Sequence, residues 1–566
     1  MQNAQAGRTD VSDMLGYDVL TQAFAAEGVD TLFALLGDAN MYWGAAMAQK
    51  QKVRMVHARH EHCACAMADG YARATGKVGV ASVTCGPGFA QVMTALSCAA
   101  RGHTPLVVFA GDSPSNATWY VQQLELGPLA TATGARYIAV KHIDRLLDAV
   151  REAFHTARVE RCPVVLGVPM DLQKQKFPWD ADYSPSAAFG PTPQRPAPDP
   201  ELLKRVADIV GEARRPIILA GRGAMRSGAR TELEALGDRC GALYATSLFA
   251  KGFFDGNRWD LGIAGAYASH LAREEFEKCD LLIGVGAGLG YYTTEAGYLY
   301  PSARVVQIDL QPRGLYQGLR TADVHVLADA KAAAAALVAE LAARVSASAG
   351  ARSPLLAGSI AAARARPDGR EYPVAPGTVD PRTAILELDA VVPKDWDIVS
   401  GGAHFCGTAI THLKGRAAER YHVINDFGAI GSAFPTAIGV AAARNDGKVL
   451  LIEGDGSLLM HIQELETLRR QGIKLLICVM NDGGYGAEVH KFRAQGIDPA
   501  EAVHGRGDLA AVARGFGLRG QLVNSTDGFA AMFAGHGQAA SAELWDIHID
   551  DTIPSVAYRR IHYGES

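Results

Sequence analysis

The sequence lacks every feature that would direct a chain to a membrane or to nucleic acid. No apolar run is long enough to cross a bilayer, and the net charge of −5 is scattered over both signs without a basic cluster. The first residues show no charged segment followed by an apolar one, so we expect no secretion signal. These absences predict a cytoplasmic protein without a membrane or nucleic-acid partner.

A disulfide framework is missing as well. The nine cysteines are odd in number and mostly stand in apolar segments, which is typical of buried thiols in a reducing cytosol. Cys63 and Cys65 form a C-x-C pair. No second pair follows at the spacing of a zinc site, so we do not expect zinc there.

The common phosphate-binding loops are also absent. The glycine-rich stretch Gly284–Gly290 fails the G-x-G-x-x-G spacing, because Leu289 and Tyr291 stand where the last glycine should be. A tight turn between a strand and a helix explains this stretch more simply. No such turn carries the lysine of a P-loop. The sequence therefore lacks the motifs that usually indicate enzymes of hydride transfer or phosphoryl transfer.

Two stretches typical of linkers divide the chain. Residues 184–200 contain six prolines, and residues 346–381 are rich in alanine, glycine, proline and serine. The blocks between them alternate short apolar runs with helical stretches, which is typical of parallel sheets. The sequence therefore predicts an α/β fold of three domains, each with a mainly parallel sheet flanked by helices, at residues 1–185, 195–345 and 375–555.

The expected elements can be placed along the chain. The clearest unit predicts a strand, a turn, a helix and a second strand at residues 448–453, 454–457, 458–471 and 473–480. Elsewhere we expect strands at 31–36, 78–84, 106–110, 164–168, 216–220, 281–285 and 305–308, and helices at 61–75 and 332–344.

Acidic turns follow both strands of that clearest unit. Gly454-Asp455-Gly456-Ser457 comes after the first strand, and Asn481-Asp482-Gly483-Gly484-Tyr485-Gly486 comes after the second. Ligands of open α/β sheets bind outside the carboxyl ends of strands, and the amides at a helix start suit a diphosphate. Mg²⁺ prefers one or two carboxylates together with phosphate oxygens. Either turn alone would be ordinary, but the pair predicts a magnesium and diphosphate site.

These turns resemble the thiamine diphosphate motif of the pyruvate decarboxylase and acetolactate synthase superfamily. Arg59-His60-Glu61 followed by Ala68–Gly76 is similar to the glutamate helix of that family, Cys85–Gly88 to its GPG turn, and Gly428–Gly431 to the segment that bends the cofactor. The resemblance covers nearly the whole chain. It implies a pyrimidine-binding, a central and a diphosphate-binding domain, in a homodimer or homotetramer whose active sites are shared between chains. Some relatives bind FAD or ADP in the central domain, which stays open here.

The resemblance also implies roles for single residues. Glu61 would hydrogen-bond the aminopyrimidine ring, Ile430 would hold the cofactor bent, and the carbonyl of Gly428 would accept from its amino group. Asp455, Asp482 and the carbonyl of Gly484 would ligate Mg²⁺. Diphosphate contacts are expected from Gly402, Ala403, His404, Gly454, Gly456, Ser457, Tyr485 and Gly486.

One residue departs from the family pattern at this site. The family commonly has Asn-Asn where this chain has Asn481-Asp482. The additional carboxylate can still bind a hard cation, and its charge tightens the metal while it repels the diphosphate.

The substrate side combines features of two groups within the superfamily. Asp38 and Glu488 match two acids of simple 2-oxo acid decarboxylases, but the histidine pair of those enzymes near residue 115 is missing. Gln122 or Gln123 could supply a glutamine that acetolactate synthases have in this region. We expect an acetolactate synthase-like decarboxylase/carboligase that takes a 2-oxo acid and an aldehyde acceptor. A simple decarboxylase that releases an aldehyde and a non-catalytic scaffold are the alternatives.

Overall fold

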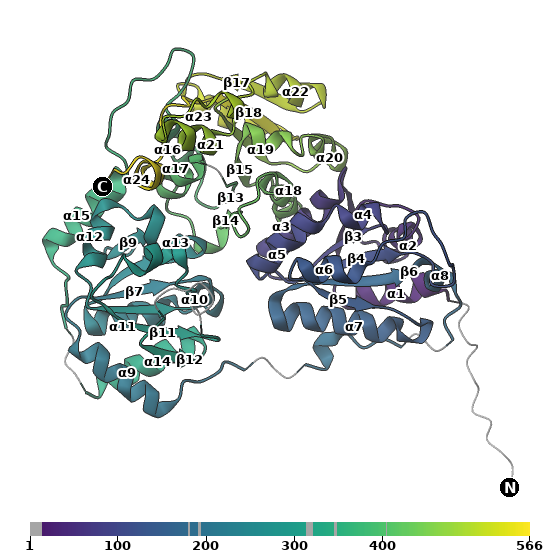
Figure 1. Ribbon diagram of the computed structural model, residues 1–566, viewed down its shortest axis with the longest axis horizontal. Coiled ribbons are helices and arrows are strands. Elements are labelled where there is room, and N and C mark those ends of the chain that lie inside the picture. The colour runs from purple at the N-terminus through teal and green to yellow at the C-terminus, as the bar shows by residue number, and fades with distance from the viewer. Residues whose placement is uncertain are drawn as a thin grey trace, which may run out of the picture.

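The computed structural model describes residues 14–178, 182–190, 194–312, 321–344, 348–402 and 404–565. Three blocks follow one another along the chain, each built on one six-stranded sheet (Figure 1). All strands within the sheets pair in parallel, for example β15 with β16, and helices pack against the sheets. The expected α/β fold with three mainly parallel sheets is confirmed.

The first block has the strand order β2-β1-β3-β4-β6-β5. Its strands are short apolar runs, and every residue of β3 and β6 is buried. The strands are β1 (Thr31–Ala34), β2 (Arg54–His57), β3 (Gly79–Val83), β4 (Leu106–Asp112), β5 (Arg136–Ala139) and β6 (Pro163–Pro169). The main helices are α1 (Gly16–Ala26), α2 (Met41–Gln51), α3 (Glu61–Thr75), α5 (Met93–Gly102) and α7 (Leu146–Thr156).

The central block has the order β12-β11-β10-β7-β8-β9. Its first helix begins at Pro200, where Asp199 caps the backbone amide of Leu202. The strands are β7 (Pro216–Ala220), β8 (Leu243–Thr246), β9 (Asp260–Ile263), β10 (Leu281–Val285), β11 (Arg304–Asp309) and β12 (Val324–Leu327). The main helices are α9 (Pro200–Glu212), α10 (Arg222–Ser227), α11 (Arg230–Cys240), α12 (His270–Glu277) and α14 (Ala330–Ala342).

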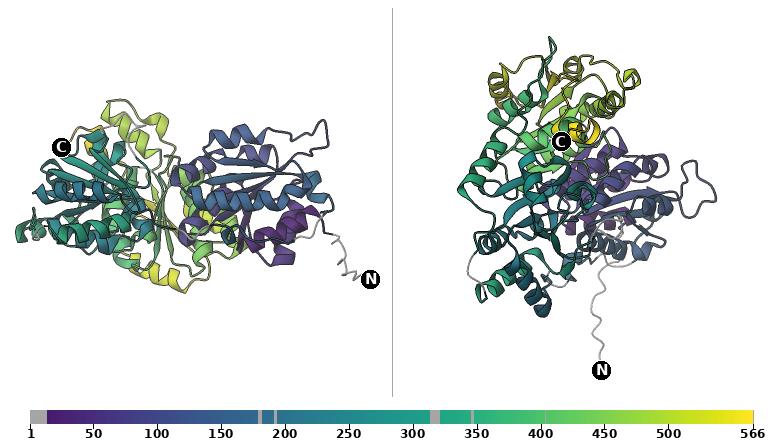
Figure 2. Two further views of the ribbon diagram at one scale, coloured as in Figure 1. Left: turned by 90° about the horizontal axis from the view of Figure 1, so that it is seen from below. Right: turned by 60° about the vertical axis from the view of Figure 1, so that its left-hand side comes forward.

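The third block has the order β14-β13-β15-β16-β18-β17, and it contacts both other blocks (Figures 1 and 2). Its strands are β13 (Asp397–Ser400), β14 (Tyr421–Val423), β15 (Val449–Gly454), β16 (Leu476–Asn481), β17 (Arg519–Val523) and β18 (Glu543–His548). The helices that matter below are α16 (Pro381–Val391), α17 (His404–His412), α18 (Ala433–Arg444), α19 (Asp455–Leu459), α20 (Glu464–Gln471), α21 (Gly486–Ala494) and α24 (Val556–His562).

Two expectations about helices are corrected. The helix expected at 458–471 is two helices, α19 and α20, separated by turns between Met460 and Gln463. The stretch 346–381 is not linker throughout, because it contains α15 (Pro354–Ala365), which Ser353 caps. Ile360 of α15 packs into a core of the central block, so tertiary burial stabilises an alanine-rich helix that composition alone suggested was a connection. The strands of each sheet fall inside the expected domains, whose boundaries stay predictions.

Helices α3 and α18 bring the first and third blocks together at backbone distance. A Cβ atom on Gly70 of α3 would lie 2.1 Å from the carbonyl oxygen of Thr436, and one on Gly439 of α18 would lie 1.9 Å from that of Met67. Glycine is therefore required at both positions for this close approach. Buried side chains of the two blocks form one continuous hydrophobic core around this crossing.

A buried ion pair network joins all three blocks at a second point. The carboxylate of Asp426 in the third block accepts hydrogen bonds from Arg73 of α3 at 2.8 Å and from Arg222 of α10 at 2.7 Å. Burial alone would raise the pKa of Asp426, but the two guanidinium groups outweigh it and lower that pKa.

In the part of the chain that the structure describes, none of the helices combines the length and the apolar character needed to span a bilayer.

The helix crossing generates a prediction about stability. Gly439→Ala should lower the free energy of unfolding by about 1–3 kcal/mol, because its Cβ would overlap backbone that cannot move without shifting α3. Gly358→Ala in α15 is the matched control, since nothing lies within 4 Å of its Cβ position. It should be neutral or stabilising by up to about 1 kcal/mol, as expected from helix propensity. Denaturant unfolding of both variants measures the difference, and equal stability of the two would contradict the close crossing.

Candidate active site

Two acidic turns lie side by side at the carboxyl edge of the third sheet. Strands β15 and β16 are parallel neighbours, with Gly454 aligned to Met480, so the turns that follow them emerge together. Asp455 begins α19, and its Oδ2 accepts a hydrogen bond of 3.0 Å from the backbone amide of Gly483 in the other turn. The two acidic turns are therefore neighbours in the fold, as the sequence predicts.

The two aspartates form an electrostatically strained pair. Burial, followed by the negative charge of Asp482, raises the pKa of Asp455 to about 8. Burial would also raise the pKa of Asp482, but the hydrogen bond and charge of His404 and the backbone amide of Gly484 together outweigh burial and lower that pKa. Two buried carboxylates of this kind repel each other when both are ionised, and a divalent cation between them would remove that repulsion. The donor set thus fits the metal that the resemblance implies.

His404 contacts the second acidic turn and lines the same cavity. Its Nε2 lies 2.7 Å from Oδ2 of Asp482, and both side chains are buried. Its Nδ1 has no hydrogen-bond partner among the described residues. The contact of His404 with the diphosphate stays a prediction, and the structure shows a contact of this histidine with the additional aspartate.

Gly486 is required by this arrangement. A Cβ atom at Gly486 would lie 1.9 Å from Oδ2 of Asp482 and 2.6 Å from the His404 ring. Asn481 precedes Asp482 in the Asn-Asp pair that differs from the family pattern. It is fully buried, and its side-chain amide donates to Asp546 at 2.8 Å and to the carbonyl of Arg506 at 3.0 Å. Asn481 is therefore held by the protein, and Asp482 faces the cavity.

A cavity of about 490 Å³ opens in front of these turns. Ile430 is half-buried and forms part of the wall of this cavity, and its role as a support for a bent cofactor stays a prediction. The hydroxyl of Ser457 accepts a hydrogen bond of 2.7 Å from the amide of Gly431, which ties the Gly428–Gly431 segment to the first acidic turn. The expected residues on the cavity wall are Gly402, His404, Gly428, Ile430, Gly454, Asp455, Gly456, Ser457, Asp482, Gly484, Tyr485, Gly486 and Glu488. Ala403 lies outside the described residues.

The expected residues of the first block gather elsewhere. Glu61 is buried in the first turn of α3, and its Oε1 lies near Gly88 of the GPG turn. Cys85 Sγ lies 3.4 Å from Oε1 of Gln122, and the Tyr120 hydroxyl donates to Asp38 across 3.3 Å. None of Asp38, Glu61, Gln122 and Gln123 is among the residues that line the cavity at Asp455.

The two candidate glutamines are separated by the fold. Gln122 contacts Cys85 beside the GPG turn, whereas Gln123 lines a different cavity with Asp112 and Lys141. Of the two, Gln122 is therefore the one that lies with Glu61 and Asp38.

The cavity wall also includes residues that the sequence did not indicate. Tyr558 comes from α24 near the end of the chain, and Tyr267 comes from the central block. Neither tyrosine belongs to a recognisable sequence motif, so their place on the cavity wall could be seen only in the three-dimensional structure. Asn425 also lines the cavity. The one sequence feature that could have indicated Asn425 is its position three residues before Gly428.

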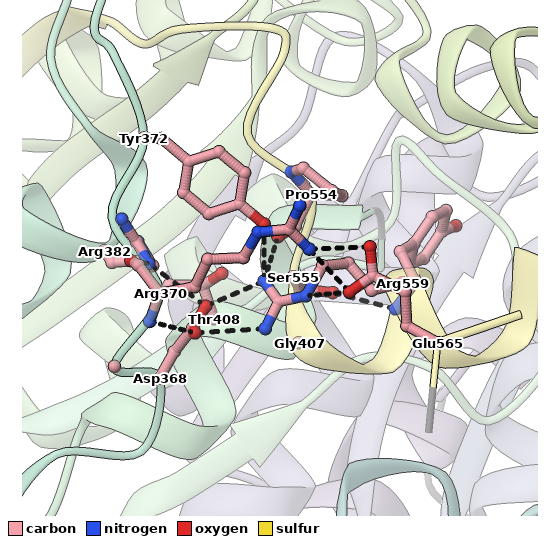
Figure 3. A network of polar contacts seen from close by, with 12 residues as sticks. Asp368, Arg370, Tyr372, Arg382, Gly407, Thr408, Pro554, Ser555, Arg559 and Glu565 are labelled. Carbon is pink, nitrogen blue, oxygen red and sulfur yellow. Dashed lines mark hydrogen bonds and ion pairs between the residues drawn. The ribbon is translucent and has the colours of Figure 1, made fainter. Parts of the chain in front are cut away.

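Helix α24 is held in place by a network of ion pairs (Figure 3). Arg559 donates to both oxygens of Asp368, at 2.9 and 3.0 Å, and to the hydroxyl of Tyr372 at 2.9 Å. Arg382 of α16 pairs with the same aspartate at 3.2 Å. This network fixes the helix that carries Tyr558 onto the segment leading into the third block.

The glycine-rich stretch of the central block is a tight turn, as predicted. Gly286 has a φ of +56°, and its carbonyl oxygen accepts a hydrogen bond of 2.9 Å from the amide of Gly223. A Cβ atom on Gly221 would lie 2.2 Å from that same oxygen. The turns after β7 and β10 thus pack against each other.

Comparison with known proteins agrees with this geometry. Three family models match in order: the N-terminal thiamine pyrophosphate binding domain at residues 14–126, the central domain of thiamine pyrophosphate enzymes at 203–337, and the C-terminal thiamine pyrophosphate binding domain at 403–538. An acetolactate synthase large subunit from Parasynechococcus marenigrum is 29% identical over 94% of this chain and 87% of its own length. A probable acetolactate synthase large subunit from Methanocaldococcus jannaschii is 27% identical over 84% of this chain and 81% of its own.

A plant relative extends this similarity. Probable acetolactate synthase 2 from Oryza sativa, a chloroplastic protein, is 28% identical over 90% of this chain and 79% of its own length. The three domain matches, in the order of the three sheets and with the acidic turns in the last one, lead to one conclusion: the chain belongs to the thiamine pyrophosphate enzymes, as an acetolactate synthase-like member of that superfamily.

Proposed function

We propose that this protein uses thiamine diphosphate and Mg²⁺ to break or form the carbon–carbon bond next to a 2-oxo group, as an acetolactate synthase-like decarboxylase/carboligase. The observation that carries the proposal is the buried pair Asp455 and Asp482 at the carboxyl edge of the third sheet, facing one cavity. The names of the relatives support a small 2-oxo acid as the substrate.

The metal would be held by the side chains of Asp455 and Asp482 and by the carbonyl of Gly484. A cation there neutralises a pair of carboxylates that burial otherwise keeps from ionising together. The amides at the start of α19 and α21 suit the diphosphate, and His404 holds Asp482 in position. The negative charge that Asp482 adds would strengthen the binding of the metal and weaken that of the diphosphate.

The remaining residues would position the reacting groups. Bound thiamine diphosphate supplies the electron sink that accepts the electron pair when carbon dioxide leaves. Glu61, buried at the start of α3, would share a proton with the pyrimidine ring, and Ile430 would support the bent form of the cofactor. Asp38, Gln122 and Glu488 would face the substrate.

We further propose that two chains share each active site, in a homodimer or homotetramer. The separation of the Glu61 group from the Asp455 cavity within one chain supports this, because a partner chain would have to bring the two groups together. All nine cysteines are unpaired, and eight of them are buried, which supports a reducing cytoplasmic compartment. FAD or ADP in the central block stays an alternative second cofactor, and the visible spectrum of the pure protein tests for the flavin.

Removal of the metal tests the central proposal. Dialysis against a chelator should abolish activity and lower the unfolding temperature, and thiamine diphosphate with Mg²⁺ should restore both. Asp482→Ala should raise the Mg²⁺ concentration needed by about tenfold or more, since it deletes a ligand, whereas Asp482→Asn keeps an oxygen and should stay active. An alanine variant with unchanged metal dependence would show that Asp482 is only a turn residue, and calorimetry without binding of the pair would refute the cofactor.

Complementation tests the sharing of the site. Glu61→Gln should reduce turnover by about 10²–10⁴ in a folded protein, and Asp455→Ala should be inactive for lack of metal. Co-expression with two different tags allows mixed dimers to be isolated. If each site takes Glu61 from one chain and Asp455 from the other, a mixed dimer has one intact site and about half of normal activity. Inactive mixed dimers would place both residues in the same chain's site.

Product analysis separates carboligation from simple decarboxylation. Glu488 lies on the cavity wall, half-exposed, and pairs with Lys491 at 3.2 Å. Release of an aldehyde needs a proton from a nearby acid, so Glu488→Gln should increase the share of carboligation product from pyruvate plus an aldehyde. Glu387→Gln, on an exposed face of α16, is the control and should leave the ratio unchanged. Aldehyde as the sole product in all three proteins would identify a plain decarboxylase.

A further inference from the structure

A second group of ligand-type side chains lies between the first and third blocks. A ring nitrogen of His60, the sulfur of Cys63 and a ring nitrogen of His461 all lie within 4.8 Å of one another. None of them belongs to the acidic turns or to the cavity in front of those turns.

The fold brings these residues together from distant parts of the sequence. His60 caps α3 and accepts from the amide of His62 at 3.1 Å, and Cys63 follows one helical turn later on the same face. His461 lies in the turn that separates α19 from α20, and its ring stacks on that of His62 at a centroid distance of 4.6 Å. The interruption of the helix expected at 458–471 is therefore what places His461 against α3.

His461 is in the protonation state of a metal ligand, whereas Cys63 has to lose its proton when a metal binds. Burial, and then the neighbouring His60, lower the pKa of His461 to about 4, so its imidazole is neutral at physiological pH, as a ligand must be. Its buried Nδ1 has no hydrogen-bond partner among the described residues. Burial and the nearby Glu464 raise the pKa of the Cys63 thiol, so in the metal-free protein Cys63 keeps its proton.

The donor atoms select a different metal from the acidic turns. Two imidazole nitrogens and a thiolate suit Zn²⁺ and similar transition metals, whereas Asp455 and Asp482 offer the oxygens that Mg²⁺ prefers. Zinc distances of about 2.0 Å to nitrogen and 2.3 Å to sulfur put two nitrogens and one sulfur of a tetrahedral site roughly 3.3–3.6 Å apart. A movement of about 1 Å would close the cluster to that size.

A fourth ligand position is also close by. The carboxylate of Glu464 lies within hydrogen-bond reach of Cys63 and accepts from the amide of Arg59 at 2.8 Å and from the Thr467 hydroxyl at 2.6 Å. Either Glu464 or a water molecule would complete four-coordination.

We propose that His60, Cys63 and His461 form a binding site for one divalent transition metal ion of the zinc type, which joins α3 to the third block. Binding would replace the thiol proton of Cys63 by the metal and release that proton to solvent. Because His60 immediately precedes Glu61, the metal would also fix the start of the helix that carries Glu61. We did not expect zinc from the sequence because no second cysteine pair follows Cys63 and Cys65. In the fold, His60 and His461 supply the further ligands that a second cysteine pair would have supplied.

Cobalt substitution in the full-length protein tests this site directly. The protein is saturated with thiamine diphosphate and excess Mg²⁺, so that the acidic turns are filled, and is then titrated with Co²⁺ under reducing conditions. We expect one further Co²⁺ per chain, with a thiolate-to-cobalt charge-transfer band, the visible bands of tetrahedral Co²⁺, and displacement by Zn²⁺. Cys63→Ser should abolish the charge-transfer band, and His461→Gln should weaken Co²⁺ binding by about tenfold or more.

Cys65→Ser is the matched control, because Cys65 is equally buried on the same helix but is not part of the cluster. It should retain the charge-transfer band at full strength. The wild-type titration decides the matter even if a variant fails to fold. Absence of a thiolate band in the saturated wild-type protein, or its persistence in Cys63→Ser, would show that the cluster is only a packing contact and overturn the proposal.

Discussion

The backbone contact between α3 and α18 is the constraint on which the catalytic arrangement depends. Gly70 and Gly439 let the two helices approach until carbonyl oxygens occupy the space that a side chain would fill. Glu61 stands at the start of α3, and Gly428–Gly431 leads directly into α18. A shift of one helix against the other would change the position of Glu61 relative to the segment Gly428–Gly431, which lines the cavity at Asp455. The packing of the first block against the third block therefore sets the geometry of these two groups.

Buried charge is handled differently at two points of the molecule. Asp426 is neutralised within the protein by Arg73 and Arg222, and it thereby holds the three blocks together. Among the described residues, no arginine pairs with Asp455 or Asp482. His404 stabilises Asp482, and His504 lies 3.8 Å from Asp455. Burying two like charges side by side is unfavourable, which supports the proposal that the acidic turns bind a cation.

The departure from the family at Asp482 comes with a compensating neighbour. His404 donates to the additional carboxylate at 2.7 Å, and Gly486 leaves the room for that contact. The histidine lowers the energy of the ionised aspartate before a metal is bound. The additional negative charge is thus stabilised by a neighbouring side chain.

The sequence by itself determined the α/β class, the three parallel sheets and the two acidic turns, because strand patterns and turn residues are local and a parallel sheet aligns its strand ends. It also indicated Ile430 and Glu61 through a family resemblance. It could not separate Gln122 from Gln123, recognise α15 as a helix, or find Tyr267 and Tyr558 on the cavity wall. Those depend on contacts between residues far apart in the chain. Only the tertiary structure decided that His461 meets His60 and Cys63, because that contact requires the crossing of α3 and α18 and a break between α19 and α20, neither of which any local pattern encodes.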